Sequence, residues 1–275
     1  MSGATRSLPV LLLQNTVSAF LAVIAVRANP AMGLELYLDL LSQPCRAVFI
    51  FAKKNGIPFQ LRTVQLLKGQ NCSKEFLQIN SLQRVPVLKD GDFILTESSA
   101  ILIYLSCKYQ VADHWYPSDL QTRSQIQEYL GWHAYNIRSI FGVTLWVRVL
   151  APLIGIQVPE EKVNRNRTYM DHALQQLESK FLGDKPFLVG QQVSLADLML
   201  LEELIQPVAV GYDVFVGRPR LAAWRGRIEA FLDTELWQEA HGPIFNILEQ
   251  MAKKTLPVPP PETQKNMLFR ISKIP

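Results

Sequence analysis

Apolar and polar residues alternate over residues 34–40, and helical spacing follows over residues 46–54. Between Leu34 and Leu40 every second residue is apolar, which is typical of a strand with one face more deeply buried. After Ser42, Pro44 suits the first turn of a helix, residues 46–54 have helical spacing, and Asn55-Gly56 is a stop signal. The pattern predicts a strand, a turn and a helix in that order.

Signals for further strands and helices continue to residue 105. Phe59 to Val64 favours a second strand, Ser73 suits the cap of a short helix through Leu77, and Ser98 precedes a run of helical spacing. Residues 87–89 and 93–95 flank Asp90-Gly91, a signal for a hairpin with a two-residue loop. The predicted element order is βαβαββα.

No strong alternation follows residue 120. Residues 113–120, which include Pro117, resemble a linker, and residues 125–150, 162–182, 194–205 and 221–232 read as helices. Ser194 and Asp197 have the spacing of a capping box, which we interpret as structural. We therefore expect an N-terminal extension over 1–31, a mixed domain over 32–112, a linker over 113–121, an all-helical domain over 122–256 and a proline-rich tail over 257–275.

Residues 1–31 have two interpretations. Arg6 followed by apolar residues 8–26 resembles a secretory signal peptide. Polar residues 14–16 interrupt that stretch, however, and it is short for a bilayer span, which needs roughly 20 mostly apolar residues. We favour an upstream extension or an alternative start before Met32, and expect no stable membrane insertion and a location in the cytosol.

Composition narrows the functional classes. The 275 residues carry 28 basic and 24 acidic side chains, scattered without a run of like charge, so nucleic acid is not an expected partner. The three cysteines, Cys45, Cys72 and Cys107, lack metal-ligand or disulfide-scaffold spacing, which favours free thiols in a reducing compartment. Phosphate loops, dinucleotide fingerprints and metal motifs are absent from the sequence, so no metal and no tightly bound cofactor is expected.

The turn Ser42-Gln43-Pro44-Cys45 is the main candidate for chemistry. A dithiol redox protein carries cysteine at both ends of such a turn, and serine in the first position excludes that reaction. A serine hydroxyl can instead donate to the sulfur of a bound thiolate, and the N-terminus of the following helix adds positive potential. On this turn alone, a plain helix cap is an equally good interpretation.

Two further features indicate a peptide-like thiol. A cis bond at Val85-Pro86 would expose the Val85 backbone to a ligand, although proline also suits a strand start. Glu97-Ser98 lies at a predicted helix N-terminus, where backbone N–H groups bind a carboxylate and an acid binds an ammonium, although a cap is again the simpler interpretation. An amino-acid end, a peptide backbone and a thiol together describe glutathione.

Three runs carry a resemblance to a known family. MGLELYLDLLSQPCRA over 32–47, LTESSAILIYL over 95–105 and VSLADLM over 193–199 resemble theta-class glutathione transferases, and the likeness extends to Pro275. The resemblance implies an α+β thioredoxin-like domain followed by an all-α domain, a homodimer, and glutathione as co-substrate for a hydrophobic electrophile. It also implies activity on aralkyl sulfates and organic hydroperoxides.

The resemblance assigns residues as well as activity. It implies a catalytic Ser42, a cis-proline at Pro86 and glutathione contacts at Val85, Glu97 and Ser98. It also implies an arginine near the leaving group, a position that Arg138 fits, although a lone helical arginine is more often solvated or salt-bridged. Trp146, eight residues further on, would line the substrate pocket if it shares that helix face, although a core position is the commoner role.

Two positions depart from the family pattern. Asn71-Cys72 replaces a His-Lys pair at the glycine end of glutathione, while Arg84 keeps a basic residue nearby, so we expect weaker glutathione binding that is not abolished. Tyr135 replaces an acid within one helical turn of Arg138, so substrate preference is expected to differ.

Two other functions stay open at this point. A non-catalytic protein of the same fold would bind apolar ligands or serve in assembly, and fold alone does not exclude it. A thioltransferase would use Cys45 and form mixed disulfides there, although Cys45 lies inside the predicted helix, one position past its proline.

Overall fold

Four strands form one mixed sheet in the order β2-β1-β3-β4. The structure, a computed structural model, describes residues 33–275, and both hypotheses about residues 1–31 lie outside them. The strands are β1 (Glu35–Leu38), β2 (Gln60–Thr63), β3 (Val87–Asp90) and β4 (Phe93–Thr96). β1 pairs parallel to β2 and antiparallel to β3, which pairs antiparallel to β4.

Helices and short turns complete this first domain. They are α2 (Gln43–Lys54), η2 (Leu66–Lys68), η3 (Gln70–Cys72), α3 (Lys74–Ile79) and α4 (Ser98–Lys108). Ser73 caps α3 as predicted, because its hydroxyl accepts a hydrogen bond from the Phe76 N–H at 3.1 Å. The order βαβαββα and the thioredoxin-like fold class are confirmed.

The hairpin loop lies one residue later than the sequence indicated. Asp90 pairs with Phe93, so the two loop residues are Gly91 and Asp92. Gly91 takes a φ of 64°, a conformation that glycine adopts without the steric cost of a Cβ atom.

After η4 (Asp113–Trp115) the chain is helical, apart from one isolated bridge between Phe187 and Gly190. The helices are α5 (Leu120–Asn136), α6 (Arg138–Phe141), α7 (Val143–Leu145), η5 (Trp146–Leu150), α8 (Ala151–Leu153), α9 (Glu160–Gln176), η6 (Leu177–Leu182), α10 (Leu195–Ala209), α11 (Pro219–Leu232), α12 (Thr234–Phe245), α13 (Ile247–Ala252) and α14 (Pro261–Ser272). The all-helical second domain is confirmed. The sequence pattern did not indicate α12, α13 or α14.

The predicted single helix over 125–150 is wrong. The α-helical path breaks at Ile137, where φ is −109° and ψ is −59°, and continues through short segments that include the π-helical η5. The helix is also interrupted at Gly142, between α6 and α7. The expectation that Arg138 and Trp146 share a helix face rested on a continuous helix and loses that basis, because this interruption lies between the two residues.

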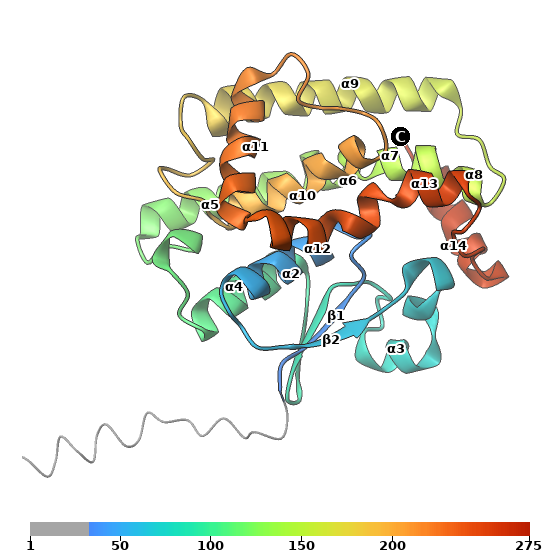
Figure 1. Cartoon of the computed structure of the whole chain (residues 1–275), viewed down its shortest axis with the longest axis horizontal. Coiled ribbons are helices and arrows are strands. Elements are labelled where there is room, and N and C mark those ends of the chain that lie inside the picture. The colour runs from blue at the N-terminus through green and yellow to red at the C-terminus, as the bar shows by residue number, and fades with distance from the viewer. Residues whose placement is uncertain (1–32) are drawn as a thin grey trace, which may run out of the picture. The chain divides into compact units, whose positions relative to one another are not determined.

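Helix α10 forms the centre of the second domain. Nearly all of its residues are buried, and it packs against α2, α5 and α11. Figure 1 shows it between the long α9 and the α2 helix of the first domain. The predicted capping box is present, since the Ser194 N–H donates to the Asp197 carboxylate at 2.9 Å. The same carboxylate accepts from Trp224 Nε1 at 2.9 Å, so Asp197 also ties α11 to α10.

The proline-rich tail ends in a helix whose destination the sequence did not reveal. Ile271 of α14 and the following Ile274 pack in one buried cluster with Val143 and Val158. Figure 1 shows α14 in red beside α8. Within residues 33–275, no helix is both long and apolar enough to cross a membrane.

Candidate functional site

Ser42 lies at the N-terminus of α2, directly after the turn that leaves β1. Its backbone is extended, with φ −92° and ψ 124°, and its carbonyl accepts hydrogen bonds from the N–H groups of Cys45 and Arg46. Its hydroxyl makes no capping hydrogen bond. The helix-cap interpretation of this side chain is therefore wrong, and the hydroxyl is available at the positive end of α2.

A fully buried arginine holds this turn from behind. Arg46 Nε donates to Glu202 Oε2 at 2.6 Å, and its Nη1 donates to the carbonyl oxygens of Leu40 and Leu41 at 3.0 and 3.3 Å. Those two residues lead directly into Ser42. The guanidinium therefore fixes the backbone that carries the serine and links it to α10.

The acid partner of Arg46 has a second polar neighbour, a buried histidine. His241 of α12 places Nε2 3.0 Å from Glu202 Oε1 and Nδ1 2.9 Å from the Trp237 carbonyl. Both ring nitrogens thus lie within hydrogen-bond distance of acceptor oxygens. Burial alone would raise the pKa of Glu202, but the charges of His241 and Arg46 hold it below its ordinary value.

Val85 and Pro86, the pair predicted to bind peptide backbone, lie directly before β3. The Val85-Pro86 bond is cis, as the family resemblance implied, and its contact with a ligand stays a prediction. Asn80 Nδ2 donates to the Arg84 carbonyl at 2.8 Å and so holds the chain just before this bond.

Glu97 and Ser98 lie at the start of α4. Glu97 is exposed and has φ 66° and ψ 115°, a conformation that costs free energy in a residue with a Cβ atom. Ser98 follows it in the first turn and is 9% exposed. Glu97 is thus the N-cap residue of α4, next to the first N–H groups of the helix, and its contact with a ligand stays a prediction.

Asn71 and Cys72 belong to η3. Asn71 Nδ2 donates to the Gln83 carbonyl at 2.9 Å, so this amide already bridges η3 to the loop before Arg84. Cys72 Sγ lies 3.6 Å from Asn266 Nδ2 of α14. The C-terminal helix thus contacts the segment that the sequence assigned to the glycine end of glutathione.

Arg138 begins α6 and has a buried partner. Its Nη1 donates to Glu203 Oε1 at 3.1 Å, where the Arg138 side chain is 42% exposed and the Glu203 side chain 3%. Trp146 packs on the cluster that includes Val143 and Val158, a core role. Tyr135 is 81% exposed at the end of α5, and its part in a substrate pocket stays a prediction.

Arg270 of α14 is an exposed residue that was not singled out from the sequence. Desolvation and the positive charges of Arg84 and Arg138 lower the pKa of Arg270, so each of these two guanidinium groups lies within electrostatic range of it. Among residues 33–275, no ion pair involves Arg84 or Arg270. The sequence did contain a signal for Arg270, because it is the single charged residue in the apolar run 267–271 and a charged side chain there must face away from the buried side.

Cys45 does not support a thioltransferase. The side chain is fully buried in α2, and burial raises the pKa of Cys45 to about 12. Since the thiolate is the reactive species, Cys45 is inert near neutral pH.

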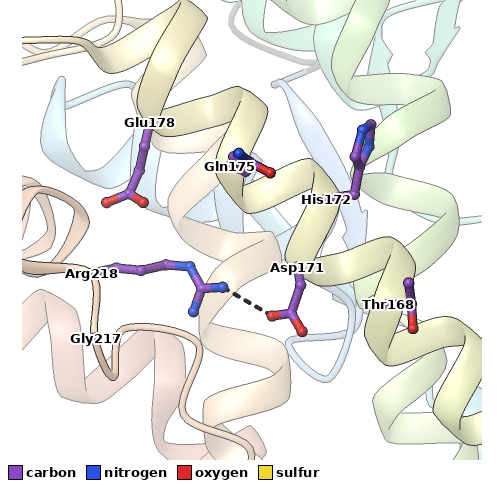
Figure 2. Close-up of a pocket in the computed structure, with 7 residues that line it drawn as sticks. All are labelled: Thr168, Asp171, His172, Gln175, Glu178, Gly217 and Arg218. Carbon is purple, nitrogen blue, oxygen red and sulfur yellow. Dashed lines mark hydrogen bonds and ion pairs between the residues drawn. The ribbon is translucent and has the colours of Figure 1, made fainter.

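A separate pocket opens on the outer side of the helical domain (Figure 2). It has a volume of about 550 Å³ and lies between α9 and the loop before α11, where Arg218 Nη2 pairs with Asp171 Oδ1 at 2.9 Å. None of the predicted site residues lines it. No cluster of three or more potential metal ligands occurs in the part of the chain that the structure describes.

A mixed sheet with a cis-proline at β3, a serine at the start of α2 and a second all-helical domain define the glutathione transferase fold. Residues 36–106 match the family described as glutathione S-transferase, N-terminal domain, and residues 140–231 match the corresponding C-terminal domain. Human glutathione S-transferase theta-2B is 75% identical over 244 residues, which cover 89% of this chain and all of that protein. The chain belongs to the theta class of the glutathione transferase family, and its function is that of a glutathione transferase.

Two solved structures of human theta-class enzymes share the fold closely. Human glutathione transferase theta-2, in complex with glutathione and an unknown ligand, has a TM-score of 0.87 at 74% identity and covers 88% of this chain and 100% of that chain. A human theta-class enzyme with the glutathione conjugate of 1-menaphthyl sulfate has the same TM-score and identity, covering 89% of this chain and 100% of its own.

Proposed function

We propose that the Ser42 hydroxyl activates the thiol of glutathione for attack on hydrophobic electrophiles, including aralkyl sulfates and organic hydroperoxides. The observation that carries the proposal is the position of the Ser42 hydroxyl at the N-terminus of α2, where it makes no capping hydrogen bond. A hydrogen bond to a charged group contributes roughly 1.5–3 kcal/mol. That free energy lowers a thiol pKa by about one to two units, from about 8.5 toward neutrality.

In this proposal glutathione binds in the first domain, along the segments that contain Ser42, Val85 and Glu97. In this arrangement Glu97 and Ser98 hold the γ-glutamyl amino-acid group, and the Val85 backbone before Pro86 pairs with the cysteinyl peptide unit. The glycine carboxylate then faces Arg84 and the Asn71-Cys72 segment. Because Asn71 already donates to Gln83, we expect weaker glutathione binding than a His-Lys pair would give.

Aralkyl sulfates place an anion near Arg138. The thiolate attacks the benzylic carbon, the carbon–oxygen bond breaks, and sulfate departs with the electron pair. Arg138 has an exposed guanidinium edge for this anion, and Arg270 adds positive potential. The complex of the human relative with a conjugate of 1-menaphthyl sulfate supports this substrate class.

A homodimer in the cytosol belongs to the same proposal. The family resemblance supports it, and the exposed apolar side chains of Phe93 and Ile94 on β4 are suited to a subunit contact. Sedimentation equilibrium of the purified chain tests this part, since a monomer at micromolar concentration contradicts it.

Ser42→Ala tests the serine mechanism. We expect turnover to fall roughly 10- to 100-fold, since the variant loses a charge-assisted hydrogen bond, while calorimetry shows glutathione binding within about threefold of the wild type. Full turnover in the variant contradicts the mechanism. A wild type that binds glutathione without turning over any electrophile would instead support the non-catalytic alternative.

A further inference from the structure

Glu203 is a buried acid that contacts both the residue after Ser42 and the arginine proposed for the leaving group. Its Oε2 accepts from Gln43 Nε2 at 3.0 Å, and Gln43 is the residue directly after Ser42. Its Oε1 accepts from Arg138 Nη1 at 3.1 Å. One carboxylate on α10 therefore contacts the serine turn and the arginine proposed for the leaving group.

Arg138 keeps one edge free of this contact. Both of its hydrogen bonds to Glu203 use Nη1, and within residues 33–275 no hydrogen bond uses its Nε or Nη2. With Nη1 anchored to a side chain that is 3% exposed, the Nε and Nη2 edge is presented in a fixed direction. That edge has the fork geometry that binds an oxyanion bidentately.

The backbone at Gly142 allows these groups to lie close together. A Cβ atom at Gly142 would lie 3.2 Å from Gln43 Nε2 and 3.8 Å from Arg138 Nη1. His133, another ionisable group buried nearby, contributes no charge, because burial and then the Arg138 charge lower its pKa to about 3. Glu202 is paired with Arg46, so Glu203 is the acid that pairs with the Arg138 guanidinium.

We propose that Glu203 is a positioning residue and the counter-ion of the leaving-group site: it orients Arg138 toward the departing anion and limits how tightly that anion is held. This inference rests on the proposed sulfate chemistry. Its second part follows from Coulomb's law, because a carboxylate next to Arg138 repels an anion on the opposite edge.

Glu203→Gln separates charge from position. The glutamine oxygen still accepts from Arg138, and its amide can still pair with Gln43 if that side chain flips. We expect the inhibition constant of inorganic sulfate, measured against an electrophile that undergoes addition without a leaving group, to fall about tenfold. The single-turnover rate with an aralkyl sulfate should not fall, because Arg138 keeps its position and the departing anion gains the same attraction in the transition state. Glu203→Ala, which removes both hydrogen bonds, should lower that rate about tenfold.

Glu249→Gln is the matched control. Glu249 is an exposed acid on α13 that pairs with Lys253, and its loss removes the same charge without changing sulfate inhibition. If sulfate inhibition is unchanged or weaker in Glu203→Gln, the inference is wrong. If Arg138→Ala abolishes inhibition in that case, the proposed leaving-group site stands and only the role of Glu203 fails. If Arg138→Ala leaves inhibition intact, both fail.

Discussion

Glu202 and Glu203 are neighbours on α10, but they serve two different regions of the Ser42 turn. Behind the turn, Glu202 lies between the buried side chains of Arg46 and His241. Beside the turn, Glu203 faces one arginine that is partly open to solvent, and its pKa is raised by burial in spite of Arg138. In the buried region the charge of Arg46 is balanced by Glu202. In the open region part of the Arg138 guanidinium stays available to a ligand.

The two regions therefore have different roles: the region around Glu202 holds the Ser42 turn in place, and the region around Glu203 is proposed to bind the substrate. Paired buried charges fix a backbone but leave nothing for a ligand to neutralise, whereas incompletely balanced cations attract an anion. Mutations in the two regions should therefore give different measured effects.

The largest effect is expected behind the turn. Arg46→Ala leaves Glu202 and the Leu40 and Leu41 carbonyls without their donor, so the free energy of unfolding should fall by about 3–5 kcal/mol. Urea unfolding measures the loss. Arg138→Ala, in the open region, should change the same quantity by less than about 1 kcal/mol. Equal losses in the two variants would remove the distinction between the regions.

Activity should respond in the opposite way. Arg138→Ala is expected to lower kcat/KM for an aralkyl sulfate roughly 10- to 100-fold, the cost of one charge-assisted contact in the transition state. Turnover of an organic hydroperoxide, whose reduction releases an alcohol, should change by less than about threefold. A parallel loss with both substrates contradicts the assignment of Arg138 to the leaving group.

The pH dependence of stability should differ in sign for the two acids. The pKa of Glu202 is lowered from 4.5, so its contribution is present above that pH and is lost as the pH falls through the lower folded-state value. The pKa of Glu203 is raised from 4.5, so its contribution is complete below that pH and is lost as the pH rises through the higher value.

Urea unfolding between about pH 4 and 8 tests both signs. Relative to the wild type, Glu203→Gln should gain stability as the pH rises. Glu202→Gln should be least stable, relative to the wild type, near neutrality. A shared pH trend in the two variants would show that their surroundings do not differ as described.

The smallest effect is expected at the glycine end of glutathione. Asn71→His with Cys72→Lys adds cationic donors, and calorimetry should show a dissociation constant for glutathione about three- to tenfold lower, equivalent to about 1 kcal/mol. Gln78→Lys, on the exposed side of α3, controls for added charge. An unchanged constant in the double variant contradicts the predicted effect of this departure.

The sequence predicted the first domain because its signals are local. Alternation, the Ser73 cap and the Asp90-Gly91 turn region each act over a few residues, and the structure contains all three elements. The helix break at Ile137 and the π-helical segment over 146–150 were not visible, because residues 125–150 keep a helical spacing throughout.

The sequence predicted candidate site residues only where a short local motif contains them. Ser42, Val85-Pro86 and Glu97-Ser98 are consecutive positions with their own signals. The Arg46–Glu202 pair and the Gln43–Glu203 contact join residues about 160 positions apart, and Arg270 approaches Arg138 only because α14 folds back. Those contacts require the tertiary structure.

The pKa of the bound glutathione thiol tests the central claim most directly. Thiolate absorbance of the glutathione complex, titrated between about pH 5 and 10, should give a thiol pKa one to two units lower in the wild type than in Ser42→Ala. Calorimetry at the same pH should confirm that both proteins are saturated. Equal thiol pKa values in the two saturated complexes would contradict the account of Ser42.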